Sequence, residues 1–79
     1  MGKSQYTRAY KAFRQQLIAA RHAVGMTQEE LATQLGRPQS FVAKYEGGER
    51  RLDIVEFLQI ARLLELDERK ICQTIKAEL

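Results

Sequence analysis

Apolar residues recur at spacings of three and four along most of this chain, which is the period of an amphipathic α-helix. The first such stripe ends before Gly25, and its apolar members are Tyr10, Phe13, Leu17, Ala20 and Val24. No segment offers a strand candidate. The pattern therefore predicts an all-α chain, and the helix boundaries have to come from capping and helix-breaking residues.

The strongest capping signals enclose residues 27–46. Thr27 and Glu30 have the spacing of a capping box, so we expect a helix to begin at Thr27. Its buried face is formed by Leu31, Ala32 and Leu35. Gly36 follows this face directly and can take the left-handed conformation that ends a helix. The sequence predicts a short helix followed by a sharp turn.

A second short helix is expected to begin near Pro38 or Gln39, because the fixed φ of proline suits a first helical turn. Its inward residues are Val42 and Tyr45, while Gln39, Ser40 and Lys44 face outward. A glutamine amide can pair with adenine, a serine hydroxyl can donate or accept, and a lysine can reach guanine or phosphate. We interpret these three side chains as base-reading residues.

The role of Phe41 is open at this stage, because its ring could press on a thymine methyl group or pack against the preceding helix. Candidate phosphate contacts are Gln28, at the start of the first short helix, with Arg50 and Arg51 after the second. Arg37, in the turn, is a further candidate. The N-terminal part of the chain is also basic, through Lys3, Arg8, Lys11, Arg14 and Arg21.

Residues 27–46 resemble the phage repressor and Cro-type, or XRE-type, helix-turn-helix family. Counted from Gln28, the family's apolar, alanine and glycine places are filled by Leu31, Ala32, Leu35, Gly36, Val42 and Tyr45. Residues 45–53 and 60–67 resemble its loop and fourth helix. The resemblance implies a compact five-helix, lambda-repressor-like domain and a structural ion pair between Arg21 and Glu46. The chain departs from the family at Arg37 and at Pro38, which replaces the usual Ser or Thr cap.

The remaining helices are predicted from Asp53 with Glu56, a second capping box, and from Asp67. The first of these helices should be heavily buried through Phe57, Leu58, Ile60, Ala61 and Leu64. On the last helix, the apolar residues at successive steps of four are Ile71, Ile75 and Leu79. We hypothesise that this stripe is a two-fold dimer interface. The alternative is that Ile71 and Ile75 close the monomer core.

The length and composition limit the classes of protein to which this chain can belong. A chain of 79 residues with net charge +3 suits one small domain, predicted here as a flexible N-terminal arm at residues 1–8 and a DNA-binding domain at 9–79. No apolar run is long enough for a membrane span, and we expect a cytoplasmic protein.

We interpret His22 as an exposed polar residue and Cys72 as a small core filler. Their spacing suggests neither catalysis nor metal binding. We expect no enzyme activity, cofactor or metal.

The pattern and the resemblance together favour a sequence-specific transcriptional regulator. It is expected to bind double-stranded DNA as a homodimer on a near-palindromic operator, with its third helix in the major groove. An alternative is an antitoxin-like module whose main partner is another protein, such as a toxin, and whose DNA binding is secondary. The apolar stripe of the last helix is the feature that favours this alternative.

Overall fold

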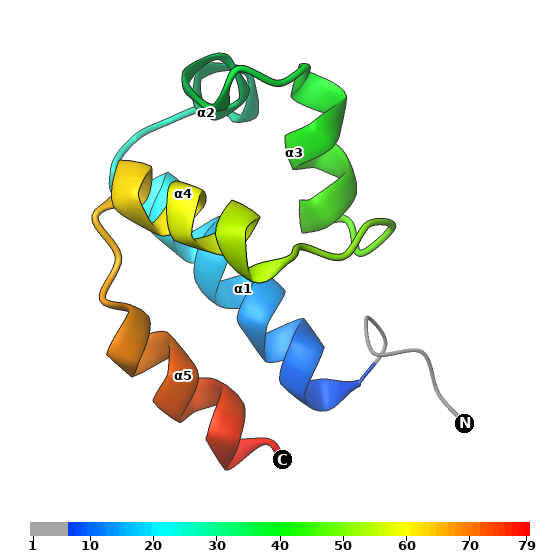
Figure 1. The fold of residues 1–79 in the computed structure, drawn as a ribbon, viewed down its shortest axis with the longest axis vertical. Coiled ribbons are helices and arrows are strands. Elements are labelled where there is room, and N and C mark those ends of the chain that lie inside the picture. The colour runs from blue at the N-terminus through cyan, green and yellow to red at the C-terminus, as the bar shows by residue number, and fades with distance from the viewer. Residues whose placement is uncertain (1–6) are drawn as a thin grey trace.

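The computed structural model describes residues 7–79, which fold into helices joined by short turns (Figure 1). The described part of the chain contains no strand. The five helices are α1 (Arg8–Ala23), α2 (Gln28–Leu35), α3 (Gln39–Glu46), α4 (Ile54–Leu64) and α5 (Glu68–Ala77). This confirms the predicted all-α, five-helix architecture.

Short side chains before the helices explain most of the boundaries. The Thr27–Glu30 and Asp53–Glu56 capping boxes are both formed, and the Asp67 carboxylate accepts a hydrogen bond from the Arg69 N–H. Each cap satisfies a backbone N–H that has no partner within the helix. α3 is the exception, because Pro38 stands at its N-cap and supplies no side-chain hydrogen bond.

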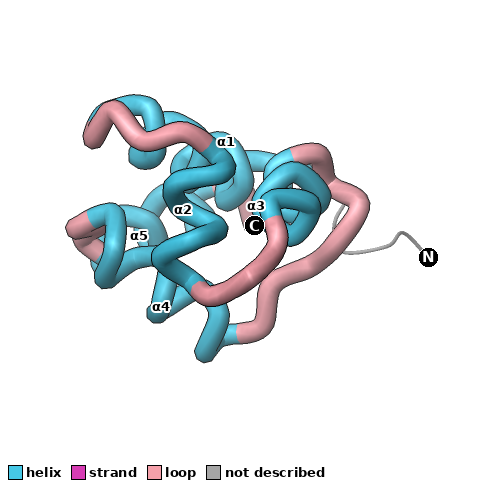
Figure 2. The backbone as a smooth tube through the Cα atoms, turned by 90° about the horizontal axis from the view of Figure 1, so that it is seen from above, coloured by secondary structure: helices cyan, strands magenta, loops and turns pink. Residues whose placement is uncertain are grey.

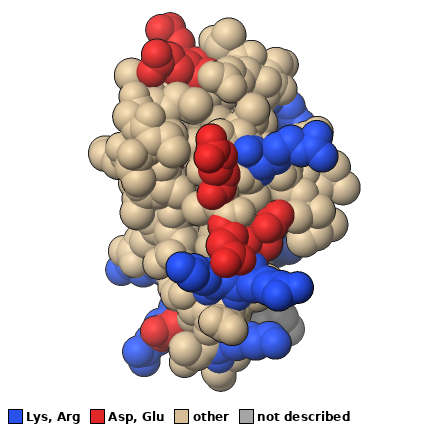
Figure 3. All heavy atoms as spheres, turned by 90° about the vertical axis from the view of Figure 1, so that its left-hand side faces the viewer, with Lys and Arg blue, Asp and Glu red and all other residues tan. Residues whose placement is uncertain are grey.

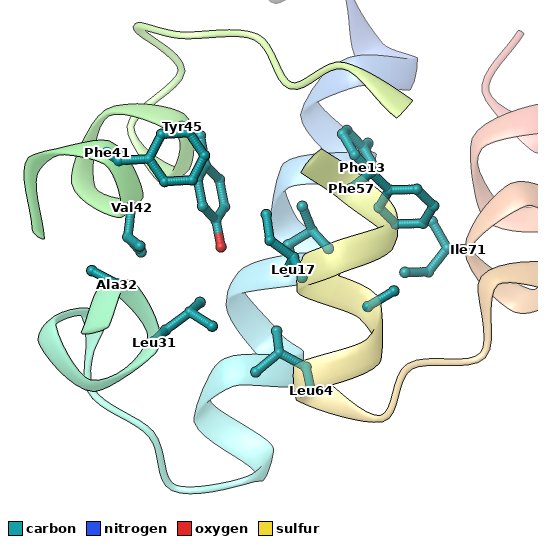
Figure 4. Close-up of a cluster of buried hydrophobic side chains, with 12 residues drawn as sticks. Phe13, Leu17, Leu31, Ala32, Phe41, Val42, Tyr45, Phe57, Leu64 and Ile71 are labelled. Atoms are coloured by element: carbon teal, nitrogen blue, oxygen red, sulfur yellow. The ribbon is translucent and has the colours of Figure 1, made fainter. Parts of the chain in front are cut away.

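The helices enclose one hydrophobic core to which all five contribute (Figure 4). α2 packs on α3, and α5 packs on α1. The rings of Phe13 and Phe57 meet edge to face between α1 and α4, with centroids 5.2 Å apart. The largest fully buried side chains are Tyr45, Leu17, Leu31, Ile60 and Val42. Tyr45 and Val42 therefore face inward, as predicted.

Two apolar residues predicted to lie on the buried faces of α1 and α4 are exposed. Val24 is 45% exposed because α1 ends at Ala23 and Val24 is its C-cap, beyond the packed face. Leu58 is also 45% exposed. It follows Phe57 directly on α4, so it points about 100° away from the buried side of the helix. The apolar residues Ile54 and Val55 share this exposed side.

The stripe on α5 is not the free surface that the sequence suggested. Ile71 is only 2% exposed and belongs to the monomer core, because α1 and α4 lie against it. Ile75 is partly buried against the same core, and Leu79 is 91% exposed. Ile71 therefore closes the monomer core, as the alternative held, and it is not available to a dimer interface. Cys72 is exposed and does not fill the core.

The N-terminal arm was predicted to extend to residue 8. Thr7, however, caps α1 by accepting a hydrogen bond from the Tyr10 N–H at 3.1 Å, and Arg8 is the first residue of that helix. Lys3, part of the basic N-terminal region, lies outside the described residues. None of the described helices is long and apolar enough to cross a membrane.

Candidate nucleic-acid interface

α2 and α3 lie next to each other and are joined by a tight turn (Figure 2). Gly36 ends α2 in the left-handed conformation, with φ at 71°. A side chain at this position would be strained, so the direction of the turn depends on glycine. The exposed side of α3 carries Gln39, Ser40 and Lys44, all three open to solvent as predicted.

Phe41 does not share this exposed side. The ring is 7% exposed and meets Tyr45 edge to face at a centroid distance of 5.6 Å. Figure 4 shows both rings within the cluster of buried side chains. The prediction that Phe41 reads bases is therefore wrong, and the alternative of packing describes the residue. One step along an α-helix is 100°, which separates Phe41 from its neighbour Ser40.

A chain of side-chain hydrogen bonds leads from the start of α3 to its end. Gln39 Nε2 donates to Gln28 Oε1 at 2.8 Å, and Gln28 Nε2 donates to Glu46 Oε1 at 2.9 Å. The Glu46 carboxylate can only accept hydrogen bonds, so it takes the Nε2 group of Gln28. The Oε1 atom of the same amide is therefore the one that accepts from Gln39. This arrangement leaves Gln39 Oε1 and one of its N–H groups without a partner among the described residues, a pattern that matches adenine N6 and N7.

The carboxylate of Glu46 lies at the C-terminal end of α3 and is paired with Arg21 of α1. Arg21 Nε donates to Glu46 Oε2 at 2.7 Å, and Nη2 donates to Oε1 at 2.9 Å. The side chains are 11% and 5% exposed. The hydrogen bonds to Glu46 raise the pKa of Arg21 above its ordinary value, against the effect of burial. The ion pair that the resemblance implied is thus present, and it is largely shielded from solvent.

Arg14 also belongs to this end of α3. Its Nη1 donates to the main-chain oxygen of Glu46 at 2.7 Å, which satisfies a carbonyl near the helix terminus. The guanidinium lies against Gly48, where an added Cβ would be 3.1 Å from Cζ. Sequence reasoning had placed Arg14 in a basic block for DNA. The one local signal for this contact is the glycine pair after Glu46, which leaves room for a large side chain.

The N-terminal end of α3 holds a second cation cluster. Arg50 Nη1 and Nη2 donate to Glu56 Oε1 and Oε2, both at 2.9 Å, and Arg37 Nη2 donates to Oε2 at 3.1 Å. Both guanidinium carbons lie near the Phe41 ring centre, at 4.4 Å for Arg37 and 4.8 Å for Arg50. The sequence had identified Glu56 only as a capping residue.

The hydrogen bonds from Arg50, followed by those from the Asp53 N–H and Arg37, lower the pKa of the Glu56 carboxyl to about 2. The Arg50 pKa is raised in turn by Glu56. Arg37 and Arg50 remain 42% and 39% exposed, whereas the Glu56 side chain is 9% exposed. The carboxylate therefore lies beneath the two cations, which stay open to an anion.

Other charges are distributed unevenly. Arg51 is exposed, and no hydrogen bond of its side chain is seen among the described residues. Arg8 forms an exposed pair with Glu78 at 3.4 Å. The side of the molecule away from α3 carries acidic and basic side chains together rather than a patch of one sign (Figure 3). The cations next to α3 are thus the better-placed candidates for phosphate.

Comparison with known proteins agrees with this geometry. The family model described as a helix-turn-helix domain matches residues 12–71. A solved structure of an XRE-family like protein from Pseudomonas syringae pv. tomato str. DC3000 is 46% identical in sequence. The match covers 87% of this chain and 84% of that chain, with a TM-score of 0.80. No curated protein matched.

Proposed function

Because this chain belongs to the XRE-type helix-turn-helix family of DNA-binding transcription regulators, we propose that it reads a specific DNA sequence with α3 in the major groove. The observation that carries this proposal is the exposed side of α3. Gln39, Ser40 and Lys44 all face solvent there. Side chains at the start of a recognition helix are the ones that meet base edges in this docking geometry.

The Gln39 amide is the main base-reading group in this proposal. Its link to Gln28 holds it in one orientation before DNA arrives, so little rotamer freedom is lost on binding. Gln28 stands at the first position of α2, where backbone N–H groups favour an anion. We therefore assign Gln28 a phosphate contact as well, which would tie the placement of the backbone to the reading of an adjacent base.

Three arginines complete the phosphate contacts. Arg51 is exposed, and Arg37 and Arg50 keep part of their guanidinium surface open beside α3. Such contacts supply affinity without sequence information and make binding depend on salt. The role of Arg21 and Glu46 in this scheme is to hold the angle of α3 against α1 rather than to touch DNA.

We further propose that the protein binds as a homodimer on half-sites roughly one helical turn apart. Because Ile71 is buried in the monomer core and Ile75 is partly buried, the α5 stripe offers little free apolar surface, and we assign the contact to the exposed apolar side of α4 instead. Ile54, Val55 and Leu58 are 66%, 60% and 45% exposed. Val55 and Leu58 also line a hollow of about 350 Å³ with Leu35 and Leu63, so one surface offers both protruding and receding parts to a second copy.

The oligomeric state tests this assignment. Leu58→Glu should leave a folded monomer, because the side chain is already half exposed, while Leu79→Glu on α5 should leave the dimer intact. Sedimentation equilibrium at high micromolar concentration, with and without DNA, distinguishes the two variants. A wild-type protein that stays monomeric even on a two-half-site duplex would refute the dimer.

The experiment for the function itself is selection of preferred duplexes from random DNA at about physiological salt, then titration against a scrambled duplex. We expect a near-palindromic sequence bound at least about a thousandfold more tightly than the scrambled one. Weak binding without preference would favour the antitoxin-like alternative. The apolar stripe that suggested this alternative is smaller than expected, since Ile71, its first residue, is buried and Ile75 is partly buried.

A further inference from the structure

Two arginines that are distant in sequence meet over one aromatic ring beside the start of α3. Arg37 comes from the turn before the helix and Arg50 from the loop after it. Both guanidinium groups lie within 5 Å of the Phe41 ring centre and donate to the same carboxylate oxygen, Oε2 of Glu56. Stacking and hydrogen bonding together hold each planar group in one orientation.

Arg37 and Arg50 keep N–H donors and positive charge that the Glu56 carboxylate does not use. Arg37 contributes one of its five N–H groups to Glu56, and Arg50 uses Nη1 and Nη2 on Glu56 and on the Arg51 carbonyl. The two cations share one hydrogen-bonded carboxylate, and the Asp53 carboxylate acts on Arg50 only through space, so positive charge remains at the exposed side of the cluster. This positive charge suits the negative charge of a DNA phosphate.

The difference in burial between the carboxylate and the two arginines determines which of them an anion meets first. The Glu56 side chain is 9% exposed, and the arginine side chains are 42% and 39% exposed. An anion that approaches from solvent therefore meets N–H groups before it meets the carboxylate. Since Gln39 and Ser40 directly precede Phe41 on α3, the phosphate within reach is one that flanks the bases read by those residues.

From this geometry we propose that Glu56 is a positioning residue that holds Arg37 and Arg50 against Phe41 and presents them as a pair to one DNA phosphate. The proposal rests on the proposed function, which assigns phosphate contacts to the two arginines, and adds the buried carboxylate as the group that prepares them. A carboxylate that only capped α4 or only neutralised the arginines would not prepare them for a ligand.

A double-mutant cycle separates these roles. Glu56→Gln removes the charge but keeps a side-chain oxygen for the capping box, where glutamine is also accepted. Affinity for the selected duplex is measured over a range of salt for wild type, Arg50→Gln, Glu56→Gln and the double variant. In wild type, Arg50→Gln should weaken binding by about tenfold and reduce the salt slope by about one.

The two roles predict opposite results in the Glu56→Gln background. If Glu56 positions Arg50, the loss caused by Arg50→Gln shrinks to less than about threefold, because the arginine is no longer held ready. If Glu56 only neutralises Arg50, the uncompensated arginine contributes more, and the loss stays equal or grows. An equal or larger loss overturns the proposal.

Arg69→Gln is the matched control, because it makes the same change in charge at an exposed position of α5, away from α3 and from the proposed dimer surface. It should leave the salt slope unchanged. A wild type without any preferred duplex would contradict the proposed function itself, whereas a preferred duplex with an additive cycle contradicts only the role of Glu56.

A measurement on the wild type keeps the test valid if Glu56→Gln fails to fold. The side-chain N–H signals of Arg37 and Arg50 in NMR spectra should shift when the selected duplex is added, and those of Arg69 should not. If the Arg37 and Arg50 signals stay in place while the backbone signals of α3 shift, the arginine pair contacts no phosphate and the proposal is overturned.

Discussion

The two ends of α3 use the same chemistry, arginine against glutamate, in different surroundings. At the C-terminal end Arg21 and Glu46 are 11% and 5% exposed. At the N-terminal end Arg37 and Arg50 are about 40% exposed over Glu56. The same ion-pair contact is thus enclosed at one end and open to solvent at the other.

This difference in burial indicates a difference in use. The buried pair is largely shielded from solvent and Gln28 also donates to Glu46, so the pair is suited to fixing the angle of the helix. The open cluster gains less from its own Coulomb attraction because water screens it, and its free N–H groups remain available to an anion. One end of α3 is therefore anchored, and we propose that the other is prepared for binding.

The largest expected effect comes from the anchored end. Arg21→Met leaves the Glu46 carboxylate buried without its cation and should lower the free energy of unfolding by about 3–5 kcal/mol. Urea denaturation monitored by circular dichroism measures the change. The control is Arg8→Met, which removes an exposed pair and should change stability by less than about 1 kcal/mol. A loss for Arg21→Met as small as that of the control would show that the two ends do not differ.

A smaller effect is expected at the open end, where Glu56→Gln should cost about 2 kcal/mol at pH 7. The pKa of the Glu56 carboxyl is about 2 in the folded protein, below its ordinary value of 4.5. The stabilisation is therefore present above pH 4.5 and is lost as the pH falls toward 2. Wild-type unfolding free energy should fall more steeply over this window than that of Glu56→Gln, as measured by urea denaturation at several pH values.

Parallel curves for the two proteins would mean that the Glu56 carboxylate is not stabilised by the arginines. The open end of α3 would then be held only by the packing of Phe41. Because Gln keeps the cap, the comparison isolates the charge of Glu56 from the start of α4.

The smallest effect on stability is expected in the core beneath α3. The Tyr45 ring is fully buried, and its hydroxyl has no hydrogen-bond partner among residues 7–79. Burial raises the pKa of this hydroxyl, which stays protonated. Tyr45→Phe removes an unsatisfied polar group and should raise the free energy of unfolding by about 1 kcal/mol. A measured loss would indicate that the hydroxyl does have a partner, such as a buried water, and that this part of the core is not dry.

The local features of the fold could be predicted from the sequence. The capping boxes at Thr27 and Asp53, the glycine turn at Gly36 and the weak cap at Pro38 each depend on residues within one helical turn. Such signals act between residues that are close in the chain, so the local sequence is enough to predict these helix ends and the turn. The exposed set Gln39, Ser40 and Lys44 followed from helical period alone.

Other predictions fail where the surroundings of a residue depend on segments that are distant in the sequence. Periodicity showed that Ile71 lies on an apolar face but not that α1 would cover that face, and it could not distinguish a covered Phe41 from an exposed one. The partners of cations are still harder to predict. Arg14 finds its acceptor 32 residues away, and Arg37 finds Glu56 19 residues away. A charged side chain reaches far and carries no periodic signal of its partner.

Above all, we propose that the exposed side of α3 reads bases through Gln39. The most direct test is the affinity of wild type and Gln39→Ala for the preferred and a scrambled duplex at the same salt, with Gln73→Ala on α5 as control. We predict that Gln39→Ala loses about 1–3 kcal/mol on the preferred duplex and almost nothing on the scrambled one. Equal losses on both duplexes would contradict the claim, because Gln39 would then contact only the DNA backbone.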